Sequence, residues 1–548
     1  MPQQNKPLII NDFSSGVIMG VHPDKMPAGA VPFAVNFCFD EEIGAAKLRK
    51  GSAMVGSQIS DGNNILGLAN FRSRSTTNHA LLAVATTIIY KGESWTSSLT
   101  GNTTGLKTRF CQFLDSIVRI NGTDGAQSFN GSSWVSSSGV FDLSNFPTGV
   151  KYVINYKDRV CAIGDNGVLY ASSLPRFYLS YDGQTADFNV GAKLTGGTSG
   201  AVATIYKDTD AGTTGTLQLT GPNGVAFQND ETITDDSGGS ATANGTGAWQ
   251  ISWTDGYVTL PIDPDNGQKG KCTGMGVIGG LLFIFFERAF YTWNGSATTA
   301  DPISSLGCSS NESITNGEKE MLFANENGWY VTQGGFPQKI SHFIQPFFDA
   351  IPSANYADFA GGCDGKFAYL SVGDVTYQGI TVNNAVLRFT LQTQEMTIYS
   401  YPTRPMVFAK YIDGTDVKLV FGDNDGNVIE IDSTDTQDNY ASSSAAIDAE
   451  IHTQQDIYPF ETGIKSLQEK IGVVSEASSG AKLYYRQDYH NNRHEDWKHL
   501  GEIKEDNQEI ALTNIDYKKI QFKVGLVSTK GRFILRKIEA PQRLINTV

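Results

Sequence analysis

The sequence predicts an all-β protein: a β-propeller of six or seven blades, with an inserted small β-domain and a C-terminal β-sandwich. A recurring strand pattern carries this prediction, with two alternating apolar stretches, a short Gly or Asp turn between them, and a closing aromatic residue. The pattern occupies 80–95, 151–174 and 273–295, with shorter versions at 319–335 and 419–432. Alternation interrupted by tight turns indicates hairpins, and hairpins repeating about every 40 residues are typical of propeller blades.

The composition supports strands and turns over helices. Only 18% of the 548 residues are charged, below the roughly 25% usual for soluble proteins, and 58 are glycine. Glycine with many Ser, Thr and Asn residues suits short strands joined by polar turns. Since 40% of the residues are hydrophobic, the chain is long and apolar enough to fill the cores of about two to four domains.

Changes of texture along the chain predict five segments. We expect an N-terminal arm with the first strands at 1–60, and the propeller at 61–190 and 251–435. We expect the inserted β-domain at 191–250 and the β-sandwich at 436–548. The repeat units of the propeller are centred at 66–95, 108–134, 150–174, 272–295, 318–340, 357–401 and 405–432.

The segment 191–247 separates the third and fourth repeat units and is rich in Gly, Thr, Ala and Asp. A disordered linker is the alternative to an inserted domain. Regular alternation at 201–205 and 216–219 favours strands, because disordered segments lack such apolar periodicity. We therefore predict a small β-domain inserted into a propeller loop.

A helix and three long strands complete the expected elements. Apolar residues at helical spacing predict a helix in 338–352, which Pro346 would kink or restrict to short turns. Near the C-terminus, 481–487, 518–525 and 531–538 have the pattern of sandwich strands.

The net charge of −15 and the pI of about 5.0 argue against a protein that grips phosphates, because neutralised phosphates supply most non-specific affinity for nucleic acids. An acidic wall would still let DNA pass without adhering to it. The N-terminus has no charged region followed by an apolar signal core, and the longest apolar run, 277–286, is about half a membrane span. We expect synthesis in a cytoplasm and no membrane insertion.

The cysteines are scattered, and no two of them form a C-x-x-C pair. Most lie in apolar strands, so we expect reduced thiols in the core and not disulfides or metal ligands. The six residues are Cys38, Cys111, Cys161, Cys272, Cys308 and Cys363.

Two patterns resemble metal sites, and both have a simpler interpretation. His490, His494 and His499 would need a helix to converge on a metal, but neighbouring asparagines indicate a surface turn. The segment Asp423–Asn427 resembles the start of a calcium loop, but position twelve is Thr434 where the loop needs Glu. We interpret it as a hairpin turn.

Motifs for catalysis are absent from the sequence. It contains no G-x-S-x-G, H-E-x-x-H or P-loop, and no pair of carboxylates stands out for glycoside hydrolysis. The glycine-rich 196–200 precedes a strand, which makes it a poor phosphate cradle. We therefore predict no catalytic, cofactor-binding or metal-binding residue and no cofactor.

Aromatic residues recur at the ends of second strands. Exposed aromatics could stack on carbohydrate, but recurrence at one repeat position favours packing between blades. These residues are Trp95, Trp134, Tyr170, Trp293 and Trp329.

The order of elements resembles the tail hub, or nozzle, proteins of short-tailed bacteriophages, which are also called packaged-DNA stabilisation proteins. The resemblance lies in the opening arm at 12–51, the apolar hairpin at 274–293, the segment 307–351 and the strands after 481. It covers most of the chain except the insert, which is similar to small β-modules inside other phage structural proteins. Its motifs are loose patterns whose specificity comes from their order.

The resemblance implies a virion structural protein that is not an enzyme. It implies a homo-oligomer, expected to be a hexameric ring, below a tail adaptor ring, with a tail needle and tailspikes beneath it. Packaged DNA would pass through the channel without sequence-specific binding. The protein would be made in the host cytoplasm and reside in the virion tail. The alternatives are a propeller glycosidase and a carbohydrate-binding, receptor-recognition protein of the virion.

Overall fold

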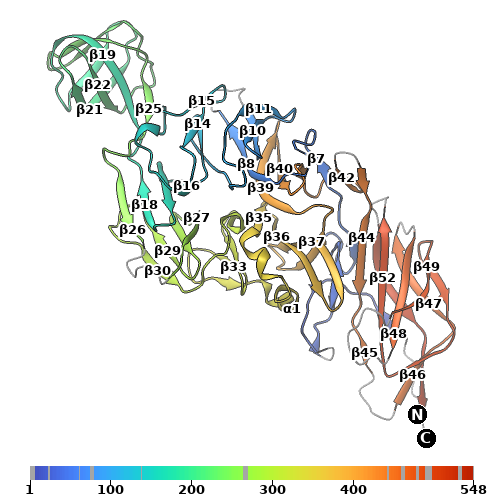
Figure 1. Cartoon of the computed structure of the whole chain (residues 1–548). Coiled ribbons are helices and arrows are strands. Elements are labelled where there is room, and N and C mark those ends of the chain that lie inside the picture. Colours follow the sequence, from blue (N-terminus) through green and yellow to red (C-terminus); the bar gives the residue numbers. More distant parts are fainter. Residues whose placement is uncertain are drawn as a thin grey trace.

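The structure is a computed structural model of the whole chain. Three bodies follow one another in Figure 1: a small barrel, a propeller and a sandwich that contains both chain ends. The residues that the structure describes are 7–22, 25–60, 62–73, 79–137, 139–262, 269–440, 443–457, 463–476, 480–487, 497–528 and 533–546.

Within these described residues the propeller has seven four-stranded sheets, so the predicted propeller is confirmed with seven blades. In blades 1 and 2 the strands are, from the axis outward, β8 (Ile65–Arg72), β9 (His79–Ala85), β10 (Ile88–Lys91), β11 (Thr96–Leu99), and β12 (Arg109–Phe113), β13 (Ser116–Ile120), β14 (Gln127–Phe129), β15 (Trp134–Val135). In blades 3 and 4 they are β16 (Val150–Tyr156), β17 (Arg159–Gly164), β18 (Val168–Ala171), β26 (Val258–Pro261), and β27 (Cys272–Ile278), β28 (Leu281–Phe286), β29 (Phe290–Trp293), β30 (Asp301–Ser304).

The remaining blades follow the same order. In blades 5 and 6 the strands are β31 (Thr315–Asn316), β32 (Met321–Asn325), β33 (Gly328–Thr332), β34 (Gln338–Lys339), and β35 (Ala360–Cys363), β36 (Phe367–Tyr377), β37 (Ile380–Thr390), β38 (Met396–Ser400). In blade 7 they are β39 (Pro405–Asp413), β40 (Asp416–Asp423), β41 (Val428–Glu430) and β7 (Ala53–Met54).

The ring is closed by a strand from the other end of the chain. In blade 7, β7 pairs with β41, with Met54 opposite Ile429 and Ala53 opposite Glu430. The inner strands β39 and β8 of the last and first blades also pack against each other. Because the ring is closed, each of the seven blades buries the apolar side chains of both its faces against its two neighbours.

Tight glycine turns make the blade hairpins. Gly279 and Gly280 join β27 to β28, and their φ angles are 58° and 74°. A two-residue turn with positive φ at both positions matches the twist of an antiparallel pair, and residues with a Cβ adopt it at a cost. The flanking strand β28 is buried almost throughout, which explains the apolar run that the sequence shows at this point.

The inserted domain is a small closed barrel between β18 and β26. Its strand β19 pairs with β22 along one edge and with β24 and β25 along the other, which closes the sheet. Its core is separate from the propeller and includes Leu194, Ile205 and Leu217. The strands are β19 (Arg176–Ala186), β20 (Lys193–Gly196), β21 (Val202–Asp210), β22 (Gly215–Thr220), β23 (Thr232–Asp235), β24 (Ser240–Ala243) and β25 (Ala248–Gln250).

The barrel begins at Arg176, upstream of the expected boundary at 191, because β19 supplies one wall of it.

Two buried serines hold the neck between the barrel and blade 3. The amide of Ser173 donates to the carbonyl of Ser252 at 2.8 Å, and the amide of Ser252 donates to Ser173 Oγ at 2.9 Å. The outgoing and returning chains therefore lie side by side.

Both chain ends build the sandwich. One sheet contains β5 (Phe37–Cys38), β6 (Ala46–Leu48), β53 (Ile534–Ala540), β47 (Lys470–Glu476), β50 (Gln508–Ala511) and β1 (Leu8–Ile10). The other contains β4 (Phe33–Val35), β44 (Ile447–His452), β52 (Lys519–Ser528), β48 (Ala481–Gln487), β49 (Lys498–Ile503) and β45 (Asp456–Ile457). The smaller sheets join β46 (Gly463–Leu467) to β51 (Ile515–Tyr517) and β54 (Gln542–Asn546), β2 (Gly16–Val17) to β3 (Ala30–Val31), and β42 (Asp438–Tyr440) to β43 (Ser443–Ala445).

The expected N-terminal arm thus supplies four strands to the sandwich, which pair with strands of the C-terminal segment or complete the same sheet, and one strand, β7, to blade 7. A local sequence pattern does not predict this pairing, because it joins strands from opposite ends of the chain, such as Leu8 with Ala540. The sandwich core continues into blades 5 and 6, where one apolar cluster includes Phe37, Phe522, Trp329 and Leu387. One apolar cluster is therefore shared between the sandwich and blades 5 and 6.

The predicted helix in 338–352 is a set of short turns, as Pro346 requires. It consists of η4 (Ser341–Ile344) and α1 (Gln345–Phe348), and Pro346 occupies the first turn of α1, where its missing N–H is not needed. Phe347 and Phe348 are fully buried in the shared core. The other short helices are η2 (Leu143–Asn145), η3 (Asn311–Ser313) and η5 (Ser353–Asp358). Within the described part of the chain, every helix is too short to cross a lipid bilayer.

All six cysteines are free and buried. Burial raises the pKa of the Cys111 thiol to about 12, because the apolar surroundings disfavour the thiolate. These thiols are therefore poor nucleophiles and behave as core residues.

A buried ion pair joins the two chain crossings between propeller and sandwich. Arg49 donates to both carboxylate oxygens of Asp438, at 2.9 and 2.6 Å, and to the carbonyl of Ser400 in blade 6 at 2.8 Å. Burial alone would lower the pKa of Arg49, but the Asp438 carboxylate outweighs it and raises that pKa. Beside the pair, the amide of Ser52 donates to the carbonyl of Gln437 at 3.2 Å. One side chain thus fixes the outgoing chain, the returning chain and a blade.

We expect Arg49→Met to lower the free energy of unfolding by about 3–5 kcal/mol, because Asp438 is left as an uncompensated buried charge. Urea denaturation followed by tryptophan fluorescence measures the loss. The matched control is Lys470→Met, at the exposed Lys470–Glu509 pair, which should leave the midpoint almost unchanged. Equal effects of the two substitutions would contradict the assigned role of Arg49.

We expect the propeller to fold without the barrel. Deleting 176–250 and joining the ends through one glycine should change the melting temperature by less than about 4 °C, the shift that about 1 kcal/mol causes in a large domain. The reason is that Ser173 and Ser252 are already hydrogen-bonded neighbours. Differential scanning calorimetry of the full and shortened chains checks this. Aggregation of the shortened chain would show that the barrel stabilises the propeller.

Candidate functional site

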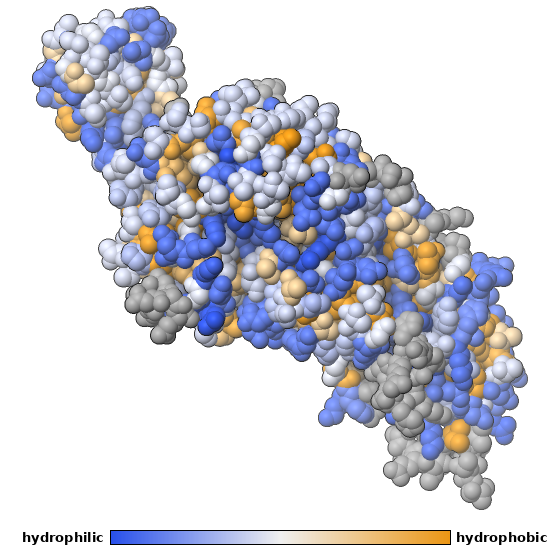
Figure 2. Space-filling view, in the orientation of Figure 1, coloured by the Kyte–Doolittle hydropathy of each residue, from blue (hydrophilic) through white to orange (hydrophobic). Residues whose placement is uncertain are grey.

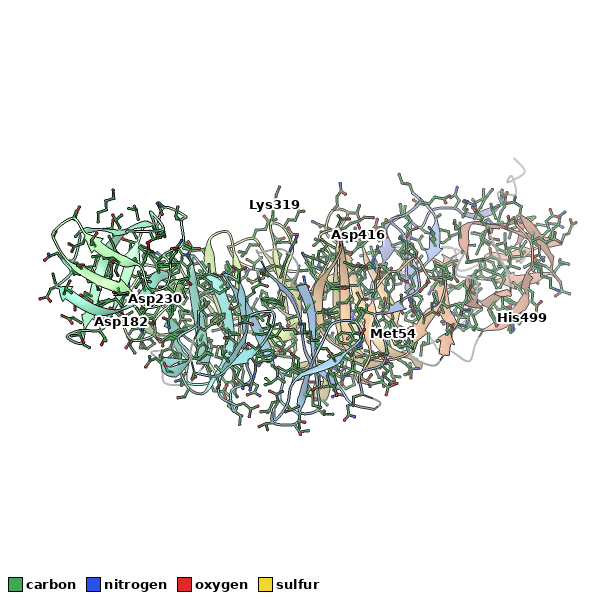
Figure 3. All side chains as sticks on the ribbon, turned by 90° about the horizontal axis from the view of Figure 1, so that it is seen from above. Met54, Asp182, Asp230, Lys319, Asp416 and His499 are labelled. Atoms are coloured by element: carbon green, nitrogen blue, oxygen red, sulfur yellow. The ribbon has the colours of Figure 1, made fainter. Side chains whose placement is uncertain are left out.

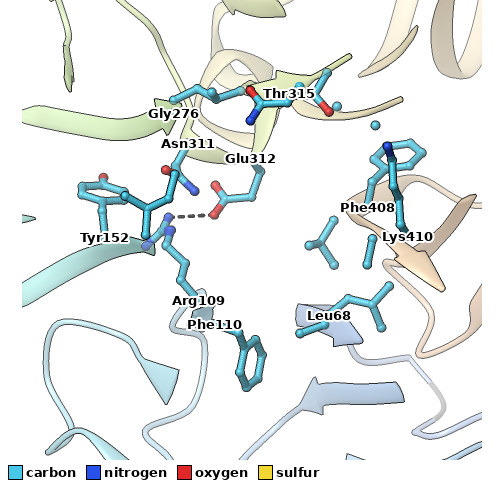
Figure 4. Close-up of a pocket in the computed structure, with 18 of the residues that line it drawn as sticks. Leu68, Arg109, Phe110, Tyr152, Gly276, Asn311, Glu312, Thr315, Phe408 and Lys410 are labelled. Carbon is cyan, nitrogen blue, oxygen red and sulfur yellow. Dashed lines mark ion pairs between the residues drawn. The ribbon is translucent and has the colours of Figure 1, made fainter. Parts of the chain in front are cut away.

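A cavity of about 480 Å³ lies on the propeller axis. Residues of the innermost strand, or of the turn before it, line the cavity in every one of the seven described blades. Axial cavities of this kind arise because seven inner strands leave a gap that their side chains fill only in part. Figure 4 shows the lining side chains converging from different blades.

An ion pair between Arg109 and Glu312 forms the polar floor of the cavity. Arg109 starts β12 and Glu312 lies in η3, and Arg109 Nη2 is 2.8 Å from Glu312 Oε1 (Figure 4). The guanidinium also lies 4.5 Å from the centre of the Tyr152 ring and donates to the carbonyl of Lys151 at 3.2 Å. Contacts on three sides hold Arg109 in one orientation.

Lys107 spans the axis at one end of the cavity. Its Nζ lies 3.5 Å from Glu312 Oε2 and 3.3 Å from Asp358 Oδ1, and it donates to the carbonyl of Ala357 at 3.0 Å. Lys107 precedes the inner strand of blade 2, whereas Ala357 and Asp358 precede that of blade 6. Because these blades are on opposite sides of a seven-membered ring, the lysine side chain reaches across the axis at this end.

Glu312 is ionised under all ordinary conditions. Burial by itself would raise the pKa of this carboxyl, but the charges of Arg109 and Lys107 outweigh burial and lower its pKa from 4.5 to about 2. A general acid needs the opposite shift, because it must carry a proton at neutral pH. Glu312 is therefore an acceptor of hydrogen bonds and unsuited to donate a proton.

The opposite wall of the cavity is apolar. Leu68 of blade 1 and Phe408 of blade 7 form it, and Phe110 follows Arg109 in blade 2 (Figure 4). Phe408 lies against the backbone of Gly362, where a Cβ atom would come within 2.7 Å of the ring. A glycine at this position is what admits the aromatic ring beside blade 6. The cavity thus has a charged, hydrogen-bonding half and an apolar half.

The rim at the other end is polar. It carries Thr315, Asn316 and the exposed Lys410, whose side chain extends toward the side of Thr315 in Figure 4. Asn311, next to Glu312, accepts from the amide of Met275 through its Oδ1 at 3.4 Å. Arginine and lysine donate, carboxylates accept, and amide and hydroxyl groups do both. The cavity therefore offers a mixed set of donors and acceptors.

Of the three histidines considered as metal ligands, the structure describes only His499. His490 and His494 lie outside the described residues. His499 lies in β49 of the sandwich, where its ring centre is 5.3 Å from that of Tyr484 (Figure 3). Across the described part of the chain, no three His, Cys, Asp or Glu side chains come together as a metal site.

The segment Asp423–Asn427 is a hairpin turn between β40 and β41. Its first residue, Asp423, accepts from the amides of Asp425 and Asn427 at 2.9 and 2.7 Å, and from Thr403 Oγ1 at 2.7 Å. These bonds use the carboxylate to stabilise the turn, as the sequence interpretation expected.

The glycine-rich 196–200 turn binds a carboxylate of the chain itself. The amides of Thr198 and Ser199 donate to Glu231 Oε2 at 3.0 and 2.8 Å. The amides that a phosphate would need are thus already satisfied within the barrel.

The recurring aromatics pack mainly in the blades. Trp293 and Trp329 are buried, as is Trp95, and Trp134 and Tyr170 are half-buried against blade cores. This agrees with the interpretation that these aromatics pack between blades, and not with exposed aromatics that stack on carbohydrate.

Sequence reasoning missed the cavity residues. Arg109, Tyr152, Glu312 and Phe408 belong to four different blades and share no motif. The sequence does contain one indication of the cavity. Charged residues such as Arg109 and Glu312 lie at or just before the first strand of a repeat, where residues that only pack the blade would be apolar.

Comparisons with known proteins add little to the geometry. No protein-family model and no curated protein matches the chain. Among solved structures, the chain is similar to YCF48 from Cyanidioschyzon merolae, with 10% identity and a TM-score of 0.35, over 70% of this chain and 98% of that one. It is also similar to YCF48 bound to D1 peptide, with 8% identity and a TM-score of 0.35, over 68% and 95%. The propeller assignment rests on the strand pairing of this chain.

We expect Glu312 to stabilise the propeller in a pH-dependent way. Since its pKa is lowered on folding from 4.5 to about 2, its contribution is complete above about pH 4.5 and is lost as the pH falls toward 2. The stability difference between the wild type and Glu312→Gln should therefore shrink between pH 6 and pH 3. Urea denaturation at several pH values measures it. A difference that grows with acidification would contradict the ion pair.

Proposed function

We propose that this chain is a virion structural protein, a subunit of the ring-shaped nozzle or hub of a phage tail. In this role it would conduct and retain packaged DNA and support the needle and spikes. The proposal starts from the order of elements along the sequence, and the architecture of the chain supports it.

The observation that carries the proposal is the apolar cluster that the sandwich shares with blades 5 and 6. Apolar residues of both sheets of the sandwich and of blades 5 and 6 form one cluster. Arg388 of blade 6 donates to Asp40 of the N-terminal segment through both Nη atoms, at 2.9 and 3.1 Å, and its guanidinium stacks on Phe367. A subunit that resists the pressure of packaged DNA needs such rigid joints, since separately packed domains move relative to one another.

The shape of the molecule suits head-to-tail assembly. The barrel and the sandwich lie at opposite ends of the propeller in two perpendicular views (Figures 1 and 3). Two different ends let one surface of a subunit contact a different surface of the next, and such heterologous contacts close into rings. The apolar groups on the face seen in Figure 2 are small and scattered, so the contacts we expect on this face are largely polar.

The charge of the chain is compatible with a DNA conduit. The net charge of −15 disfavours tight binding of a polyanion, and DNA has to slide through a nozzle.

A glycosidase is less compatible with the cavity. Glycoside hydrolysis needs one carboxyl group that carries a proton and one that is ionised. Glu312 is held ionised by two cations, and Lys107 lies between it and Asp358. These carboxylates neutralise cations, and the geometry gives neither of them the role of an acid.

We expect the purified full-length chain to form a ring of six, alone or with the tail adaptor protein. Native mass spectrometry would then detect a species of six times the 59.3 kDa chain mass, and negative-stain images would show a ring with a central channel. The chain with 176–250 deleted tests whether the barrel contributes contacts.

Two outcomes would contradict the proposal. A chain that stays monomeric at every concentration and does not join tail particles would overturn the structural role. A trimer without a channel would favour the receptor-recognition alternative.

A further inference from the structure

We propose that the axial cavity is a binding site for a neutral saccharide, which it holds without cleaving. This proposal goes beyond the ring-forming role and is independent of it. The cavity volume of about 480 Å³ falls within the roughly 300–1,000 Å³ typical of ligand sites.

The charge balance of the floor selects against ions. The two cations Lys107 and Arg109 face the two carboxylates Glu312 and Asp358 at distances of 2.8 to 3.5 Å. At the floor a bound anion would approach Glu312 and a bound cation would approach Arg109, and each would lose hydration there without a free countercharge. A neutral ligand avoids both costs.

The floor also needs a ligand that donates and accepts at neighbouring positions. Arg109 offers only donors and Glu312 only acceptors, while the Asn311 amide beside them offers both. Adjacent hydroxyl groups of a sugar ring match this set, because each hydroxyl donates once and accepts at its lone pairs. Hydrogen bonds to charged partners are also the stronger kind.

The apolar wall supplies the second half of the recognition. Leu68 and Phe408 lie across the cavity from Arg109 and Glu312 (Figure 4). A sugar ring carries C–H groups on its faces and hydroxyls on its rim, and the electron-rich face of an aromatic ring attracts C–H groups. An amphipathic cavity therefore fits a saccharide better than a purely polar or purely apolar solute.

Lys107 narrows one end of the site. Lys107 spans the axis from blade 2 to Ala357 and Asp358 before blade 6, so a ligand reaches the floor past Thr315 and Lys410 at the other end. With Lys107 across one end, the cavity suits the terminal unit of a glycan better than a glycan that passes through. Because Glu312 is paired with Arg109 and Lys107, it has no proton to give to a glycosidic oxygen, and we expect binding without hydrolysis.

Saturation-transfer NMR on the full-length chain tests the proposal. The probes are the methyl glycosides of glucose, galactose and N-acetylglucosamine, together with maltose; benzoate and putrescine serve as an anionic and a cationic probe. We expect at least one neutral saccharide to receive saturation, and benzoate and putrescine to receive none.

Four variants place the signal in the cavity. Thr315→Trp, which fills the cavity mouth and leaves the ion pair intact, should abolish binding. Glu312→Gln should weaken saccharide binding about tenfold or more, the effect of losing a charged hydrogen bond. Lys410→Ala should weaken saccharide binding less than Glu312→Gln does, because it removes one donor at the rim and leaves the floor intact. The matched control Glu509→Gln, at an exposed ion pair of the sandwich, should bind like the wild type.

Three results would overturn the proposal. The first is the absence of binding by every saccharide, and the second is saccharide binding that survives Thr315→Trp. The third is benzoate binding that strengthens in Glu312→Gln and is lost in Lys410→Ala, which would identify an anion site. Thermal unfolding of each variant checks its folding, and Thr315→Trp carries the test if Glu312→Gln does not fold.

Discussion

The structure depends on one constraint, the closure of the seven-bladed ring by a strand from the N-terminal segment. Since β7 completes blade 7 by pairing with β41, the chain before β7 and the chain after β41 must leave the ring at the same place. That shared exit is why both chain ends can build one sandwich. Arg49 and Asp438 lie at this exit, each almost wholly buried, and their ion pair fixes the two crossings to each other and to blade 6.

Closure of the ring also determines which domain is packed rigidly against the propeller and which is only tethered to it. The sandwich adjoins the exit and shares its core with blades 5 and 6, whereas the barrel is attached to blade 3 through two neighbouring chains and has its own core. An interface with a continuous apolar core resists relative motion, and a narrow neck does not. The molecule therefore combines a stiff body with an appended module, an arrangement that suits a subunit with different neighbours at its two ends.

The axial cavity is a second consequence of closure. Seven inner strands define its diameter, and Lys107 is long enough to bridge it at one end. The cations and carboxylates at this end neutralise one another, so burial of charge is tolerated there. A cavity with a neutral, hydrogen-bonding floor and an apolar wall recognises an uncharged solute, and this property does not depend on whether the chain forms a ring.

The sequence by itself determined the class of fold and the positions of the repeats. Alternation and turn residues are local signals, and each predicted repeat centre falls within one blade. Local signals also predicted the short turns around Pro346 and the hairpin at Asp423. Only the tertiary structure decided that there are seven blades, that the barrel starts at Arg176, and that the strands β1, β4, β5 and β6 belong to the sandwich. It also brought Arg109, Glu312 and Phe408 together. Each of these depends on pairing or packing between distant segments, and no local pattern of residues encodes which distant segment a strand will meet.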